Sequence, residues 1–246
     1  MIQLNVIDRV HRVQDSFVNW YLIEDGGRLT IVDAGLPVSW DSLGDAVTRL
    51  GRTLRDVEAV VLTHAHFDHV GFAERARTQL GVPVWLHEDD VAIAEHPLRY
   101  PHESSSLPYL RHPKTVQVVA SFLRNGWLSV KPVHGVSTFR DGQTLDVPGS
   151  PTVVFTPGHT PGHCSFHLKD RDTVIAGDAL VTFNPYTGGE GPQIVAAAAT
   201  ADSRQALSSL DGLAATGART VLPGHGEPWR QGAREAVERA RAMGPT

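Results

Sequence analysis

The feature that most restricts the fold of this 246-residue chain is the segment Thr63–Gly71, which reads THAHFDHVG. It places three histidines and an aspartate within six residues, immediately after a short apolar run of the kind found in buried strands. Imidazole nitrogens and carboxylate oxygens are suitable ligands for zinc and related divalent ions. In an extended loop His64 and His66 would point to one centre, while Asp68 and His69 would turn toward a second. The sequence therefore predicts a strand that ends at a metal site.

Other histidines and aspartates follow short apolar runs in the same way. His159 stands between glycine and proline turns in TPGHTPGH, Asp178 follows Ala-Gly after a short strand, and His225 stands in PGHG after another. Asp33, in VDAG, follows an apolar run near the start of the chain. Each alone is a common turn residue. Together they predict that several strand ends converge on one metal centre.

Composition and charge exclude several classes of protein. Lys and Arg number 22 against 27 Asp and Glu, and the net charge of −5 disfavours a nucleic-acid partner, which needs a basic surface. The single cysteine, Cys164, allows neither an internal disulfide nor a thiolate cage. The first residues carry charges where a signal peptide is apolar, and no apolar run approaches the ~18 residues of a membrane span. We therefore predict a cytoplasmic protein without a membrane partner and leave its oligomeric state open.

Two halves with a similar order of elements organise the chain, each running from strands through a helix to a strand that ends in histidine. Apolar runs predict strands at residues 3–7, 19–23, 29–32, 59–62, 82–86, 144–147, 152–155, 164–168, 173–175 and 219–222, and helical spacing predicts helices near 43–50, 72–80, 115–124, 203–215 and 233–240. This order predicts two packed sheets covered by helices. The proline-broken stretch at about 87–131 is interpreted as an insertion into a single domain, 1–246.

In this order the motifs resemble those of the metallo-β-lactamase superfamily of binuclear metal hydrolases. The VDAG run, the H-x-H-x-D-H loop and then His159, Asp178 and His225 occur in the same order as the motifs of that family. The resemblance covers nearly the whole chain. It implies an α/β fold, a four-layer αββα sandwich with a helical insertion and with the site along one edge of the sheets. It also implies the roles of individual residues: one metal on His64, His66 and His159, a second on Asp68, His69 and His225, Asp178 bridging both, and Asp33 supporting the ligands from behind.

The resemblance implies two divalent ions per chain, zinc first, with iron or manganese as alternatives. A water shared by two ions forms hydroxide near neutral pH, and the ions polarise a carbonyl. We therefore expect hydrolysis of an ester, lactone or thioester bond in a small-molecule acyl substrate, with Asp68 and Asp178 as the catalytic carboxylates. The alternative is a mononuclear iron oxidoreductase of the persulfide dioxygenase type, using His64 or His66 with His159 and Asp178.

Departures from individual branches of the family narrow the substrate. True β-lactamases usually lack an aspartate at the position of Asp178, which disfavours β-lactam hydrolysis. Glyoxalase II-type thioesterases and persulfide dioxygenases usually carry a Gly-Cys-Gly-Arg element soon after the aspartate that corresponds to Asp178. This chain has no such element there. Acyl-homoserine lactonases have a tyrosine where this chain has Val181, leaving Tyr186 as a candidate replacement. The insertion carries aromatic residues that either cover the substrate or form the insertion's own core: Tyr100, Tyr109, Phe122 and Trp127.

Overall fold

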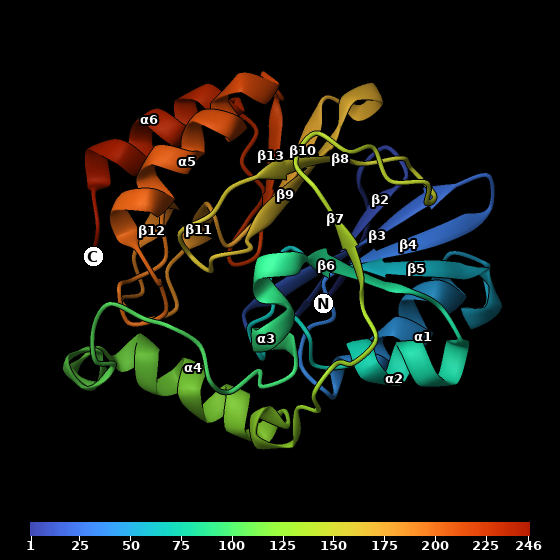
Figure 1. Cartoon of the computed structure of the whole chain (residues 1–246), viewed down its shortest axis with the longest axis horizontal. Helices are drawn as coiled ribbons and strands as arrows, with labels where there is room; N and C mark the ends of the chain where they lie inside the picture. Colours follow the sequence, from blue (N-terminus) through green and yellow to red (C-terminus); the bar gives the residue numbers. More distant parts are fainter.

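The computed structural model describes residues 1–246 and arranges them as a four-layer αββα sandwich (Figure 1). The first sheet has seven strands in chain order: β1 (Ile2–Ile7), β2 (Val10–Asp15), β3 (Val18–Asp25), β4 (Arg28–Val32), β5 (Val57–Val61), β6 (Val84–His87) and β7 (Ser137–Phe139). The second has four strands in the order β13 (Thr220–Pro223), β10 (Thr173–Gly177), β9 (Cys164–Leu168) and β8 (Thr152–Phe155). A separate hairpin pairs β11 (Val181–Phe183) with β12 (Glu190–Gln193). The predicted fold class is confirmed.

Helices cover the outer faces of both sheets. In Figure 1 the helices α1 (Ser39–Arg49) and α2 (Ala73–Leu80) lie against the seven-stranded sheet, and α5 (Ser203–Thr216) and α6 (Ala233–Met243) lie against the four-stranded sheet. The region at 87–131 contains the short α3 (Val91–Ala94) and the longer α4 (Pro113–Arg124), which lies at the edge of the sandwich. No helix is both long enough and apolar enough to cross a lipid bilayer.

Alternation of side chains along the strands produces the layers. Successive residues of a strand face opposite sides of the sheet. In β3, Trp20 belongs to the core under α1 and α2, whereas Tyr21 faces the opposing sheet. In β10, Ile175 joins the core between the sheets, whereas Val174 packs toward α5 and α6. Both sheets are thus apolar on two faces, which accounts for the apolar runs in their sequences.

Two differences from the predicted elements have clear physical reasons. The predicted strand at 144–147 is wrong, because the chain turns there: the N–H of Leu145 donates to the carbonyl of Pro151, and only Thr144 forms a single bridge to β8. The strand β2 was not predicted, because its sequence VHRVQD is mostly polar. Arg12 is nevertheless fully buried there and donates to both carboxylate oxygens of Glu227, at 2.7 and 2.8 Å.

Candidate metal centre

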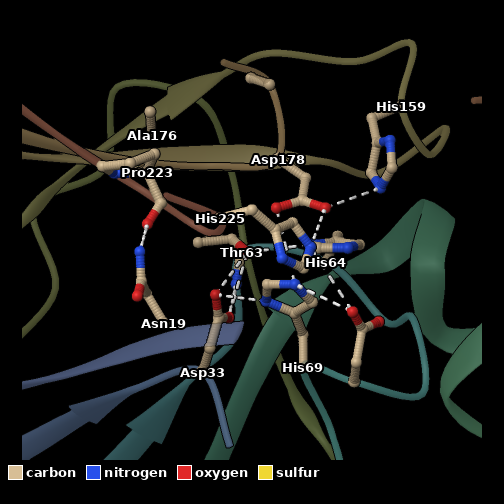
Figure 2. A network of polar contacts seen from close by, with 12 residues as sticks. Asn19, Asp33, Thr63, His64, His69, His159, Ala176, Asp178, Pro223 and His225 are labelled. Carbon is tan, nitrogen blue, oxygen red and sulfur yellow. Dashed lines mark hydrogen bonds and ion pairs between the residues drawn. The ribbon is translucent and has the colours of Figure 1, made fainter. Parts of the chain in front are cut away.

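Strand ends from both sheets meet at one edge of the sandwich. The strands β4 and β5 are parallel neighbours in one sheet, and β10 and β13 are parallel neighbours in the other. Parallel neighbours end on the same side, so the loops after their carboxyl ends lie together. Asp33 follows β4, the segment Thr63–Gly71 follows β5, Asp178 follows β10, and His225 follows β13. The loop after β8 brings His159 to the same place (Figure 2).

The structure brings all seven predicted ligands together in three groups of candidate metal ligands, two of which share no residue and are connected by the third, His64, His69 and Asp178. The first ligand group is His64, His66 and His159, and the second is Asp68, His69 and His225; within each, the candidate ligand atoms lie within 4.8 Å of one another. Asp178 lies between the groups: its Oδ1 is 3.6 Å from Nε2 of His69, and its Oδ2 is 3.5 Å from Nε2 of His159 and 3.2 Å from Nε2 of His225. Ligands about 2.1 Å from a shared ion lie roughly 3–4 Å apart.

Unpartnered polar atoms at the centre of this arrangement fit a divalent cation. The buried atoms without a hydrogen-bond partner include Nε2 of His64, His66, His69 and His159 and Oδ1 of Asp178. Buried polar atoms are nearly always satisfied, so five unsatisfied atoms converging on one space require a common partner. Imidazole and carboxylate ligands suit zinc, iron or manganese. The residues present therefore match the donor set that the superfamily resemblance implies.

Hydrogen bonds at Nδ1 hold the imidazoles so that Nε2 faces the centre. Nδ1 of His225 donates to the carbonyl of Phe17 at 2.8 Å, and Nδ1 of His159 lies 3.4 Å from the hydroxyl of Thr200. Nδ1 of His69 lies 2.9 Å from a carboxylate oxygen of Asp33. A proton on Nδ1 leaves the Nε2 lone pair free for coordination.

Asp33 supports ligands of both groups from behind (Figure 2). Besides its contact with His69, its carboxylate accepts the N–H and the hydroxyl of Thr63, and that hydroxyl lies 2.9 Å from Nδ1 of His64. Asp33 is almost completely buried and has a left-handed backbone with φ of 63°. A strained non-glycine conformation persists where the surrounding structure enforces it, often at functional sites.

Asp90 joins the two loops that carry the first ligand group. Its buried carboxylate accepts the N–H of Ala65 at 3.0 Å, the hydroxyl of Thr160 at 2.7 Å and the N–H of Gly162 at 2.7 Å. Sequence analysis did not select this residue, because it stands in the acidic triplet Glu88–Asp90, which is typical of an exposed turn. Only its position three residues after the end of β6 was a usable signal.

His163 fixes the backbone at Asp178. Its Nε2 accepts the N–H groups of Asp178 at 3.0 Å and Ala179 at 3.1 Å, and its Nδ1 lies 2.9 Å from the hydroxyl of Thr156. His163 is therefore not aimed at the ligand space, although it stands in the same TPGHTPGH run as His159. The density of histidines in that run was the signal for a structural role near the site.

Polar groups of β3 anchor the loop that carries His225. The side-chain amide of Asn19 donates to the carbonyl of Pro223 at 2.9 Å (Figure 2). The hydroxyl of Tyr21 donates to the same carbonyl at 2.7 Å. Gly224 follows, and a Cβ atom there would stand 2.0 Å from Oδ1 of Asp178. Only glycine fits this close approach between backbone and carboxylate.

The histidine pKa values of the two ligand groups are shifted in opposite directions by burial and by neighbouring charges. Burial is the largest cause that keeps the pKa values of all three histidines in the first ligand group below 6.5. Burial also opposes protonation of His69, but the carboxylates of Asp178, Asp33 and Asp68 outweigh it and raise the pKa of His69 to about 10. The pKa of His225 is raised as well, against burial, chiefly by Asp178. At neutral pH the first group is neutral, whereas a cation entering the second must displace protons.

A cavity of about 480 Å³ adjoins the ligands. Phe67, which stands between His66 and Asp68 in the chain, lines it, and so does Tyr100, whose ring centroid is 4.0 Å from that of His66. Phe122, Trp127 and Tyr186 line it too, whereas Tyr109 packs on Tyr186 from outside. Phe122 also packs against Phe67, so this aromatic residue of the insertion contributes both to the core and to the cavity wall.

Comparison with known proteins identifies the family. The sequence profile of the metallo-beta-lactamase superfamily matches residues 13–225, and the chain belongs to that superfamily. A Bacillus subtilis protein named probable metallo-hydrolase YflN is 28% identical over 242 residues, covering 89% of this chain and 84% of the relative.

Solved structures agree with this family. The metallo-beta-lactamase family protein TTHA1429 from Thermus thermophilus is 27% identical and superposes with a TM-score of 0.71 over 97% of this chain and 80% of that protein. TTHA1623, solved in a di-iron-bound form, is 26% identical with a TM-score of 0.61 over 92% of this chain and 95% of that protein. The chain is thus similar to metallo-hydrolases in sequence and fold.

Proposed function

We propose that the protein is a metal-dependent hydrolase that uses two divalent ions, zinc first, to cleave an ester, lactone or thioester bond in a small acyl substrate. The observation that carries this proposal is the clustering of seven buried histidine and aspartate residues into two three-residue groups with Asp178 between them, where five of their nitrogen and oxygen atoms have no hydrogen-bond partner. The name of the YflN relative supports hydrolysis. The di-iron form of TTHA1623 supports a two-ion site and keeps iron as an alternative metal.

The first ligand group would hold one ion and the second would hold the other, with the carboxylate of Asp178 lying between the two groups. When bound, such ions supply Lewis-acid polarisation of a carbonyl and activation of water at neutral pH. Asp178 carries full negative charge, because the imidazoles of His225, His69 and His159 outweigh its burial and keep its pKa well below the usual range. That charge offsets the positive charge of the ions. Burial raises the pKa of Asp68, which makes it the better proton acceptor of the two carboxylates.

Two tyrosines of the cavity wall, Tyr100 and Tyr186, are suited to bind the substrate's oxygen atoms. Burial raises the pKa of Tyr100 to about 12 and holds the pKa of Tyr186 well above its usual value, so both phenols stay protonated at neutral pH. A neutral phenol can donate a hydrogen bond to a carbonyl or a leaving oxygen. Tyr186 is therefore our candidate for the role of the tyrosine that acyl-homoserine lactonases carry at the position of Val181 in this chain.

Metal content together with a substrate panel tests this function. Protein purified without chelator is expected to hold about two equivalents of metal, to hydrolyse aryl esters or lactones faster than amides, and to lose that activity on chelation and regain it with zinc. Asp178→Asn is expected to lower metal content and turnover, whereas Asp170→Asn, at an exposed residue before the start of β10, serves as the matched control.

Three further substrates in the panel test the branch of the family. Nitrocefin, S-lactoylglutathione and glutathione persulfide represent the β-lactamase, glyoxalase II and dioxygenase activities. Preference for any of them over every simple ester and lactone would contradict the proposed substrate class. A single equivalent of iron at full activity would instead favour the mononuclear oxidoreductase that uses His64 or His66 with His159 and Asp178.

A further inference from the structure

The cavity beside the ligands is closed by apolar side chains at its floor and open at its rim. Val118 and Phe122 are buried on the floor, whereas Leu98 and Leu110 are about half exposed at the rim. Apolar side chains also form most of the remaining wall. Arg99 is the only residue of permanent charge on the wall, and it is exposed. The cavity therefore offers a large apolar surface and no buried charged group to pair with an ionic substituent.

The volume of this cavity sets it apart from an ordinary packing gap. Protein interiors contain few voids larger than a water molecule, whereas about 480 Å³ lies within the range of small-molecule binding sites. Its lining comes from segments far apart in the chain: Phe67 belongs to the loop of the metal ligands, Val119 to α4, and Tyr186 to the connection between β11 and β12. A gap internal to the insertion would not be lined by these three regions.

Tyr100 and Tyr186 supply hydroxyl groups to the cavity wall, and Tyr100 lies next to the candidate ligand His66. Tyr100 packs its ring against His66, and the hydroxyl of Thr115 in α4 donates to the carbonyl of Tyr186, so both tyrosines are held in place. The Asp68 carboxylate is close enough to influence the ionisation of both phenols. A molecule in the cavity would thus have its polar group beside the ligands and its remainder among Phe122, Trp127 and their neighbours.

We propose that this cavity binds an apolar hydrocarbon substituent of the substrate, and that it makes the protein selective for esters, lactones or thioesters bearing a medium-length alkyl chain or an aryl group. The proposal rests on the hydrolytic function proposed above, because the scissile bond must lie at the ligand groups while the hydrocarbon occupies the cavity. Each methylene buried there strengthens transition-state binding by about four-fold. Selectivity therefore rises with chain length until the cavity is full.

Homologous ester series test this selectivity with the metal-loaded protein. We expect kcat/KM for p-nitrophenyl acetate, butyrate and hexanoate to rise by about four-fold per methylene. A second series of alkyl acetates of increasing alcohol length distinguishes a hydrocarbon on the acyl side from one on the leaving group. A rise in either series supports the proposal, and values independent of chain length in both series overturn it.

Two variants connect the length dependence with the cavity. Val119→Phe places a larger side chain on the wall, where it occupies part of the cavity. Leu110→Trp does the same at the exposed rim without disturbing the core. Each is expected to lower the hexanoate-to-acetate ratio of kcat/KM by about ten-fold. The matched control is Val116→Phe, on the same helix but half exposed and outside the cavity, which keeps the wild-type ratio. If Val119→Phe and Leu110→Trp keep the wild-type hexanoate-to-acetate ratio, as Val116→Phe is expected to do, the hydrocarbon binds elsewhere.

Direct binding separates failure of this proposal from failure of the hydrolytic function. Calorimetric titration of the metal-loaded protein with 2-octanone and 2-butanone, which have no scissile bond, is expected to give tighter binding of the longer ketone, abolished by Val119→Phe. That result without ester hydrolysis would retain the cavity and refute the hydrolase. Metal-dependent ester hydrolysis with no preference for the longer ketone or ester would retain the hydrolase and refute the cavity.

Discussion

Replacing Asp90 by alanine is expected to destabilise the protein and to weaken the first ligand group. The carboxylate accepts three hydrogen bonds, from Ala65, Thr160 and Gly162, and the substitution leaves two of these donors as buried backbone N–H groups. Hydrogen bonds to charged acceptors contribute about 1.5–3 kcal/mol each. Against this, burial raises the pKa of Asp90 to about 6, so ionisation of the folded carboxyl costs about 3 kcal/mol at neutral pH. The expected net loss in the free energy of unfolding is about 2–4 kcal/mol.

The same pKa gives this loss a definite pH dependence. Because the folded pKa of Asp90, about 6, lies above the unfolded value of 3.8, the folded state binds its proton more tightly. The stabilisation from that proton is complete below pH 4 and disappears as the pH rises through 6. The difference between wild type and Asp90→Ala is therefore expected to be about 1 kcal/mol larger at pH 5 than at pH 7.5.

Thermal and urea denaturation of the chelated and metal-loaded protein measure this effect. A loss of 2–4 kcal/mol in a chain of this length lowers the melting temperature by roughly 5–15 °C. The neighbouring Asp89→Ala, whose side chain is about half exposed, is the matched control. Asp90→Asn keeps the size but turns an amide N–H toward existing donors, so we expect an intermediate loss. Equal melting temperatures for Asp90→Ala and Asp89→Ala would refute the reasoning.

Three further predictions concern the metal centre. Gly224→Ala, whose Cβ would stand 2.0 Å from Oδ1 of Asp178, is expected to cost at least one equivalent of metal by elemental analysis, whereas Gly44→Ala in open space costs none; unchanged metal content in the first would contradict the close approach. Because the pKa of His69 is raised to about 10, metal entry into its group is expected to release protons near pH 7 and to weaken as the pH falls; titration calorimetry in buffers of different ionisation heat counts the protons, and zero release refutes the assignment. Asp33→Asn removes a charged acceptor and is expected to weaken metal binding by about 10–100-fold in a chelator competition, and wild-type affinity would argue against support from behind the ligands.

Much of the candidate site could be predicted from sequence, because its chemistry is compact along the chain. Three histidines and an aspartate occur within one loop, and the remaining ligands each follow a short apolar strand. Strand ends on one side of a sheet must meet, so the local pattern was sufficient to predict convergence. The structure brings these residues together as expected. The assignment of each ligand to one ion stays a prediction that metal analysis must test.

Residues whose role depends on distant partners could not be predicted in this way. Asp90 looks like an exposed acidic turn residue until the loop containing Thr160 folds against it, 70 residues further along the chain. The charged Arg12 makes the sequence of β2 typical of an exposed segment. In the folded chain Arg12 is paired with Glu227, which is 215 residues away. Hydrophobic periodicity reports which face of a segment is buried, but it does not identify the polar partner of a buried charge. Such contacts become visible only in the folded chain.

In the proposed function, selection of the substrate and support of the metals would depend on different parts of this fold. The ligands are fixed by strand ends and by buried carboxylates such as Asp33. The outer wall of the cavity comes instead from α4 and from the loop at Tyr186, which are linked to each other by the hydrogen bond from Thr115. Changes in α4, such as at Val119, can therefore alter the space for a substituent without moving a metal ligand. This division explains physically why a motif identifies the chemistry of the site, while the substrate has to be inferred from the shape of the cavity.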